Sequence, residues 1–151
     1  MDKDIVQEVV TSMRYTTKSE GTASRADIYG YTEVGKTGTA EKIIGGKYSK
    51  SVHLTSFIGF APVTDPQFVL LVVIDEPEAK YIPGVGKNHM GGACCAPVFR
   101  EIGIRTLQYL GVELDDPYGY PLGDPRYDPE KGDWIKECRA LKSLYQAWNT
   151  R

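Results

Sequence analysis

Apolar residues recur every three or four positions at the start of the chain, and this spacing predicts an amphipathic helix over residues 2–15. The apolar positions on its predicted face are Ile5, Val6, Val9, Val10 and Met13. Asp2 or Asp4 lies where a carboxylate caps the free N–H groups of a first turn. A chain that begins directly at a capped amphipathic helix is typical of a segment from inside a longer protein.

The pattern changes to that of β-strands after Gly30. One strand is predicted from Tyr31 to Ile44, and Gly45-Gly46 predicts a tight hairpin turn into a second strand over residues 52–61. A third strand is predicted over residues 68–74, which are seven consecutive apolar residues. Such a run indicates a strand that is covered on both faces. Three strands joined by short turns predict an antiparallel meander.

A helical period returns later in the chain. Pro97 suits the first turn of a helix, because its missing N–H is not needed there. The apolar spacing then predicts a helix over residues 97–110, with Gly111 as its stop. We therefore expect the first domain to span residues 1–111.

The remaining residues predict a linker and a second amphipathic helix. Residues 112–132 are rich in Asp, Gly and Pro, and we predict an extended linker there. Residues 133–151 predict a C-terminal helix capped by Asp133. Its apolar stripe would be a docking face and consists of Trp134, Cys138, Leu141, Tyr145 and Trp148.

Composition excludes several classes of function. The 151 residues carry a net charge of −2 without a basic stripe, so no nucleic-acid partner is expected. No apolar run reaches the length of a membrane span, and the first residues lack the apolar segment of a signal peptide, so the chain itself is expected to be soluble. Cys94, Cys95 and Cys138 lack a metal-ligand spacing, and neither a metal nor a cofactor is expected.

The candidate chemistry lies in residues 35–40, which read Gly-Lys-Thr-Gly-Thr-Ala. Two interpretations of Lys36 compete. A Lys-Thr-Gly box on an edge strand is one signature of penicillin-recognising serine acyl transferases. The run from Gly30 to Thr37 also fits the nucleotide P-loop pattern Gly-x-x-x-x-Gly-Lys-Thr.

The P-loop interpretation has one further support and two local objections. Asp75-Glu76 follow an apolar strand, as does the acid that holds magnesium in such enzymes. However, the loop interior is bulky and contains Glu33, where backbone amides would have to wrap phosphates. Gly38 and strand-like residues follow Thr37, where a helix should begin. A P-loop nucleotide-binding protein is therefore a remote alternative.

On an antiparallel edge strand, the Lys36 ammonium and the hydroxyls of Thr37 and Thr39 could project toward a cleft. One ammonium with two hydroxyls suits the recognition of a small carboxylate. Gly38 would leave one side of the strand bare, so a peptide-like substrate could lie against the backbone as a further strand. Taken alone, these residues also fit an ordinary solvated hairpin strand.

The longer sequence around this box resembles class B penicillin-binding proteins, the monofunctional peptidoglycan transpeptidases of elongation and division. Residues 31–42 are similar to the third active-site strand of that family, and Ser56 to Pro62 are similar to its next strand. Asp75-Glu76-Pro77 after an apolar strand, and the run from Gly91 to Phe99, match the elements that follow. Gly21-Thr22-Ala23 upstream also matches.

The resemblance covers about residues 2–110. It implies an α+β fold in which helices pack on an antiparallel three-strand meander, as a partial penicillin-binding or β-lactamase-like transpeptidase fold. It implies a peptidoglycan D,D-transpeptidase that works by serine acyl transfer at the extracytoplasmic, periplasmic face of the bacterial inner membrane. The implied partners are the D-Ala-D-Ala stem peptide, β-lactams and the remainder of the transpeptidase domain.

The resemblance also implies roles for individual residues. Lys36 would be catalytic, supporting proton movement around the serine. Thr37, Gly38 and Thr39 would bind the substrate or β-lactam, with the two hydroxyls on its carboxylate. The Thr39 backbone N–H would complete the oxyanion hole. Ser56 and Glu76 match the motifs as structural residues.

The chain departs from the family pattern at the nucleophile, because no Ser-x-x-Lys occurs in it. In the family, the Ser-x-x-Lys and Ser-x-Asn elements lie N-terminal to everything matched here. We therefore expect an inactive C-terminal fragment whose exposed apolar surface promotes self-association. The main rival hypothesis is a non-catalytic interaction module on the same scaffold, and a β-lactamase or carboxypeptidase relative is a third.

Overall fold

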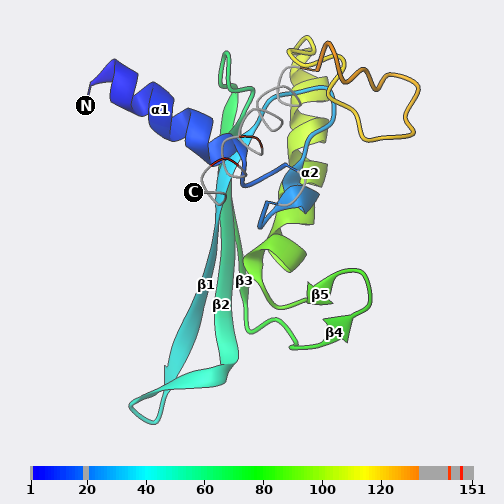
Figure 1. The fold of residues 1–151 in the computed structure, drawn as a ribbon. Coiled ribbons are helices and arrows are strands. Elements are labelled where there is room, and N and C mark those ends of the chain that lie inside the picture. Colours follow the sequence, from blue (N-terminus) through cyan, green and yellow to red (C-terminus); the bar gives the residue numbers. More distant parts are fainter. Residues whose placement is uncertain (1, 19–20, 133–142, 144–146, 148–151) are drawn as a thin grey trace. The chain divides into compact units, whose positions relative to one another are not determined.

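The computed structural model describes residues 2–18 and 21–132, together with Ser143 and Ala147. Its elements are α1 (Lys3–Arg14), the 3₁₀ turn η1 (Ser24–Ala26), β1 (Val34–Ile44), β2 (Lys47–Ala61), β3 (Phe68–Asp75), β4 (Tyr81–Ile82), β5 (Gly86–Lys87) and α2 (Gly91–Leu110) (Figure 1). The described chain divides into two compact units, of which the second contains residues 29–32 and 113–132. The predicted stripe from Trp134 to Trp148 lies outside the described residues.

The start of α1 confirms the predicted cap. The Asp2 carboxylate accepts the Asp4 backbone N–H at 2.9 Å. The apolar stripe of α1 remains exposed at Ile5, Val6 and Val9. Among the helices that the structure describes, none is both long enough and apolar enough to cross a lipid bilayer.

Three strands form an antiparallel sheet in the order β1-β2-β3, as the sequence predicts. Gly45 and Gly46 turn the chain between β1 and β2 with φ angles of 59° and 80°, which glycine adopts without steric cost. The first part of β2 pairs with β1 alone, so this hairpin extends past the end of β3 (Figure 1). The predicted meander and the α+β class are confirmed.

The core of the first unit lies between α2 and one face of the sheet (Figure 1). Phe57 on β2 and Phe99 on α2 are fully buried, with ring centroids 4.8 Å apart at an interplanar angle of 66°. Phe68 on β3 adds a third ring, whose centroid is 5.9 Å from that of Phe99. Apolar burial and edge-to-face ring contact therefore attach α2 to two strands at once.

The opposite face of β3 is exposed. The side chains of Val69, Leu71 and Val73 are 71%, 56% and 50% exposed. The prediction that this strand is covered on both faces is therefore wrong for the described residues. The apolar run supplies two apolar faces, because side chains alternate along a strand, but the described elements bury only the face toward α2.

α2 begins at Gly91, so the predicted start at Pro97 is wrong. Sequence rules treat two adjacent glycines as breakers, but here close packing requires them. A Cβ on Gly91 would lie 2.3 Å from the Ser56 carbonyl oxygen, and one on Gly92 would lie 1.8 Å from the Thr22 carbonyl oxygen.

Pro97 lies inside α2, where its lack of an N–H leaves the Ala93 carbonyl without its helical donor. The Arg25 guanidinium donates to that carbonyl at 2.8 Å. A side chain from a distant segment thus replaces the missing helical bond. The helix ends at Gly111, which has a φ of 66° and confirms the predicted stop.

Two histidines stack beside the start of α2. The ring centroids of His53, on β2, and His89 lie 4.8 Å apart at an interplanar angle of 29°. Both residues are more than nine-tenths buried, and each Nδ1 is buried without a hydrogen-bond partner among the described residues. Burial, followed by the neighbouring His53 and Lys87, lowers the pKa of His89 below its ordinary value.

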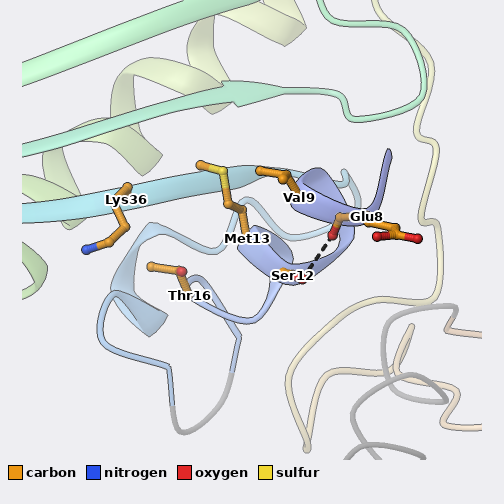
Figure 2. A pocket seen from close by; sticks show the side chains of 6 residues that line it. All are labelled: Glu8, Val9, Ser12, Met13, Thr16 and Lys36. Carbon is orange, nitrogen blue, oxygen red and sulfur yellow. Dashed lines mark hydrogen bonds between the residues drawn. The ribbon is translucent and has the colours of Figure 1, made fainter. Parts of the chain in front are cut away.

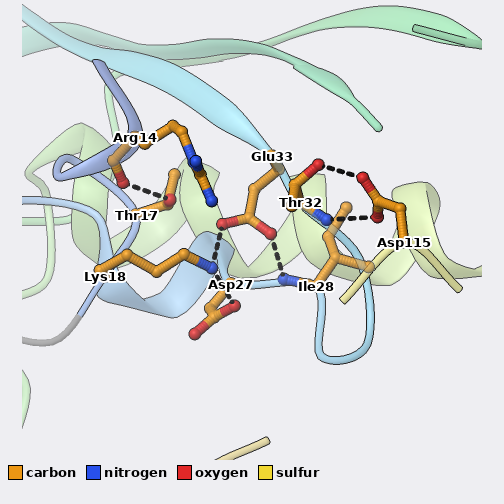
Figure 3. Close-up of polar contacts among 8 residues, drawn as sticks. All are labelled: Arg14, Thr17, Lys18, Asp27, Ile28, Thr32, Glu33 and Asp115. Atoms are coloured by element: carbon orange, nitrogen blue, oxygen red, sulfur yellow. Dashed lines mark hydrogen bonds and ion pairs between the residues drawn. The ribbon is translucent and has the colours of Figure 1, made fainter. Parts of the chain in front are cut away.

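The second unit is organised around residues 29–32. The Asp115 carboxylate accepts the Thr32 backbone N–H at 2.7 Å and also accepts the Thr32 hydroxyl (Figure 3). Tyr120 is buried in this unit, with its ring centroid 6.4 Å from that of Tyr29. Residues 113–132 contain turns but no helix or strand. The domain boundaries drawn from the sequence group these residues differently and stay a prediction.

We expect Phe99→Ala to lower the free energy of unfolding by about 3–5 kcal/mol, because it leaves a cavity among three packed rings. The matched control is Val98→Ala, one position earlier in α2, where the side chain is 39% exposed and the cost should be below about 1 kcal/mol. Urea unfolding measures both values. Equal effects of the two substitutions would contradict the proposed core.

We expect stability to fall as the pH drops below about 6.5, the ordinary pKa of histidine. The unfolded chain binds a proton at His89 more readily than the folded chain does, so protonation favours unfolding. His89→Phe keeps a stacked ring but does not titrate, and it should flatten the dependence of melting temperature on pH between about 7.5 and 5.5. An unchanged slope in this variant would show that another group is responsible.

Candidate active site

The four predicted site residues lie on β1, which is an edge strand as expected: Lys36, Thr37, Gly38 and Thr39. Side chains alternate between the faces of a strand, so the two threonines share one face and Lys36 lies on the other. Thr37 pairs with Phe57, which places the threonines on the face that packs against α2. The ammonium and the hydroxyls therefore reach the open edge from opposite faces.

The two threonine hydroxyls lie beside elements that approach from elsewhere in the chain. Thr39 Oγ1 accepts the backbone N–H of Gly91, the first residue of α2, at 3.3 Å. Thr37 Oγ1 lies 3.5 Å from Thr22 Oγ1. Thr22 belongs to the segment between α1 and β1, and its sequence context predicted no chemical role for it. Its only signal was its place in a matched Gly-Thr-Ala run.

Lys36 lies on the exposed face. Its ammonium donates to the Thr37 carbonyl at 2.9 Å. An open hollow of about 430 Å³ lies between Lys36 and α1, where Val9 and Met13 supply apolar side chains and Glu8, Ser12 and Thr16 supply polar ones. Figure 2 shows the ammonium directed away from Met13 and Val9. Lys36 is thus available to a group that enters beside α1.

Gly38 has a steric reason to be glycine. A Cβ at this position would lie 2.5 Å from Ser56 Oγ on the neighbouring strand. The glycine therefore allows Ser56 to lie against the strand backbone. This contact supports the structural interpretation of Ser56.

The P-loop alternative is wrong. β1 continues through Thr37 to Ile44, so no helix N-terminus follows the lysine to face a phosphate. Upstream of the pattern, residues 24–26 form the short turn η1 and residues 27–29 belong to no strand, so no buried parallel strand leads into the pattern. Asp75 and Glu76 instead accept the Lys42 ammonium at 3.0 and 2.6 Å, which is a structural contact at the end of β3.

These groups can bind a carboxylate and an extended peptide. The two threonine hydroxyls, which share one face of β1, are donors that suit a carboxylate group. The open edge of β1 offers backbone groups to an added strand. In the described residues, the geometry of β1 thus supplies groups that suit recognition of a ligand.

Comparison with protein families matches residues 1–103 to the transpeptidase domain of penicillin-binding proteins. Stage V sporulation protein D of Bacillus subtilis is 40% identical over 112 residues, which are 72% of this chain and 16% of that protein. The probable peptidoglycan D,D-transpeptidase PenA of Neisseria flavescens is 36% identical over 74% of this chain and 26% of its own length. The chain thus spans about a quarter or less of the length of these relatives.

Solved structures of penicillin-binding proteins are also similar to this chain. The transpeptidase domain of penicillin-binding protein 3 from Burkholderia pseudomallei superposes with a TM-score of 0.63 at 34% identity, covering 76% of this chain and 32% of that one. Penicillin-binding protein 3 of Mycobacterium tuberculosis, in complex with ampicillin, superposes with a TM-score of 0.63 at 27% identity, covering 82% of this chain and 27% of that one.

Proposed function

Because this chain belongs to the penicillin-binding protein transpeptidase family, we propose that it forms the C-terminal part of a peptidoglycan D,D-transpeptidase. The parent enzyme cross-links cell-wall peptides on the extracytoplasmic, periplasmic side of the inner membrane. The observation that carries the proposal is the edge strand β1, with its two threonine hydroxyls on one face and an exposed lysine on the other.

In the proposed reaction, a serine from the remainder of the domain attacks the carbonyl carbon between the two D-alanines of the donor. An ester forms to the serine oxygen, the peptide C–N bond breaks, and the terminal D-alanine leaves with a proton on its nitrogen. An acceptor amine then attacks the ester, forms the cross-link and releases the serine. A β-lactam carbonyl undergoes the first step in the same way.

Each residue of the strand has a proposed role in this reaction. Thr37 and Thr39 bind the donor carboxylate, and Gly38 lets the peptide lie close to the strand. The Thr39 backbone N–H stabilises the oxyanion as the serine attacks. Lys36 is the catalytic cation that supports proton movement around the serine. The open edge of β1 supports these roles, because substrate backbone could pair there.

A rival proposal is a non-catalytic interaction module on the same scaffold. It is favoured by one observation, which is that no Ser-x-x-Lys occurs in the 151 residues. The two proposals differ in whether a complete protein that carries this segment forms an acyl-enzyme.

Fluorescent penicillin should leave these 151 residues unlabelled, because they contain no Ser-x-x-Lys nucleophile. In the complete protein, Lys36→Ala should slow covalent labelling by about 100-fold or more while the melting temperature changes little. The matched control is Lys42→Ala on the same strand. This variant removes an ammonium that forms ion pairs with Asp75 and Glu76, and it should label normally.

Labelling of the isolated 151 residues would place a nucleophile within them and overturn the assignment of this chain as one wall of the site. Normal labelling of Lys36→Ala would remove Lys36 from the reaction. Absence of labelling in the complete wild-type protein would favour the interaction module.

The exposed apolar face of β3 should make the 151 residues self-associate. We expect a sedimentation coefficient that rises with concentration. Leu71→Lys should reduce the association, because it places a charge on that face. The control Leu122→Lys changes an 86% exposed leucine outside the sheet and should have little effect. A monomer at every concentration would contradict this expectation.

A further inference from the structure

The hydroxyl of Thr22 lies next to the proposed carboxylate site although the residue is not on the edge strand. Its Oγ1 is 3.5 Å from Thr37 Oγ1, and the Thr22 side chain is exposed. Thr37 shares its face of β1 with Thr39. Three hydroxyls therefore gather on one side of the edge strand, two from β1 and one from the segment that connects α1 to β1.

The backbone of that connecting segment is held against α2. The Thr22 carbonyl oxygen approaches Gly92 so closely that a Cβ there would lie 1.8 Å from it. The Arg25 guanidinium donates to the Ala93 carbonyl at 2.8 Å. Ala23, between these two contacts, is fully buried. Thr22 and the residues that follow it are thus packed against the helix.

The ends of the same segment are joined by a buried ion network. The Lys18 ammonium lies 2.8 Å from an Asp27 carboxylate oxygen and 2.8 Å from a Glu33 carboxylate oxygen (Figure 3). The second Glu33 oxygen accepts the Ile28 backbone N–H at 3.0 Å. Figure 3 also shows the Arg14 side chain directed toward Glu33. All three members of the ion network are buried.

The two carboxylates stabilise the charged form of Lys18 in spite of its burial. Burial alone would lower the pKa of Lys18, but the charges of Glu33 and Asp27 outweigh it and raise that pKa above its ordinary value. Buried charges are costly unless each has a well-placed partner, so such a network tolerates little change in geometry. Glu33 is the residue just before β1, and Lys36 follows three positions later. The Glu33 carboxylate therefore connects the start of β1 to Lys18 and Ile28, which belong to the segment that carries Thr22.

We propose that Thr22 supplies a third hydroxyl to the carboxylate site of Thr37 and Thr39, and that Lys18, Asp27 and Glu33 are positioning residues that hold it there. This inference rests on the proposed function and extends it to a residue outside the edge strand. A carboxylate has about four lone-pair sites for hydrogen bonds, and threonine hydroxyls rotate to donate to them. The ligands concerned are carboxylate-bearing acyl donors, namely D-alanyl peptides and β-lactams.

The test measures the rate of acylation of the complete protein by a carboxylate-bearing β-lactam. Rapid-mixing experiments at several β-lactam concentrations give the half-saturating concentration and the maximal rate. Thr22→Val keeps the shape but removes the hydroxyl. This variant should raise the half-saturating concentration about tenfold, because one hydrogen bond to a charged group is lost. The maximal acylation rate should stay within about twofold of the wild-type rate. Thr22→Ser should restore wild-type values. Ser24→Ala, an exposed hydroxyl on the same segment, is the matched control and should have no effect.

The positioning residues are tested by a double-mutant cycle. Glu33→Gln should raise the half-saturating concentration as Thr22→Val does, and the double variant should be no worse than Glu33→Gln alone. If Glu33→Gln does not fold, Asp27→Asn gives the same measurement. The positioning role would be overturned by the following result: Glu33→Gln lowers the melting temperature, but Thr22→Val still raises the half-saturating concentration about tenfold in the Glu33→Gln background.

Failure of this inference is distinguishable from failure of the proposed function. Thr39→Val and Lys36→Ala should weaken acylation whether or not Thr22 takes part. If both do so while Thr22→Val behaves as wild type, Thr22 is not part of the site. If neither does so, the proposed function itself fails. A β-lactam methyl ester, which lacks the free carboxylate, should acylate wild type and Thr22→Val equally, and a persistent difference would overturn the carboxylate assignment.

Discussion

The close packing of the first residues of α2 against the sheet is the constraint on which the candidate site depends. Gly91 lies against the carbonyl oxygens of Ser56 and Gly38, where a Cβ would be 2.3 and 2.7 Å from them. At this distance the Gly91 N–H reaches Thr39 Oγ1. Gly92 receives the Thr22 carbonyl in the same way. A larger side chain at Gly91 or Gly92 would push α2 away from β1 or from the segment that carries Thr22. The three threonine hydroxyls would then move apart.

Charge acts differently in the two ionic clusters of the chain. The Lys42 contacts with Asp75 and Glu76 are largely exposed, so solvent screens them and they contribute little to stability. The Lys18 network is buried, where losing one partner leaves a charge without compensation. The buried network is therefore the one that can fix geometry near the site, although two of its members, Lys18 and Asp27, lie outside the sequence runs that match the family.

The open surfaces of the chain agree with a role as one wall of a larger site. The apolar faces of α1 and β3 are exposed in the described residues, and β1 has a free edge. The relatives are several times longer than this chain. We interpret these surfaces as the places where the remainder of a transpeptidase domain would pack and supply the nucleophile.

The sequence by itself determined the features that depend on local backbone preference. These are the Asp2 cap of α1, the Gly45-Gly46 hairpin, the antiparallel meander and the Gly111 stop, and they follow from capping, turn chemistry and apolar periodicity. The motif around Lys36 also identified the family and the edge strand. A Lys-Thr-Gly box alone is not specific, but here the flanking strands match the family as well.

Only the tertiary structure decided the features that depend on contact between distant residues. The start of α2 at Gly91, the exposure of one face of β3 and the approach of Thr22 to Thr37 have no local signature. Arg25 can satisfy a carbonyl that Pro97 leaves open because folding brings together residues 68 positions apart. Periodicity states which side chains share a face, but which neighbour covers that face, and at what distance, is set by packing.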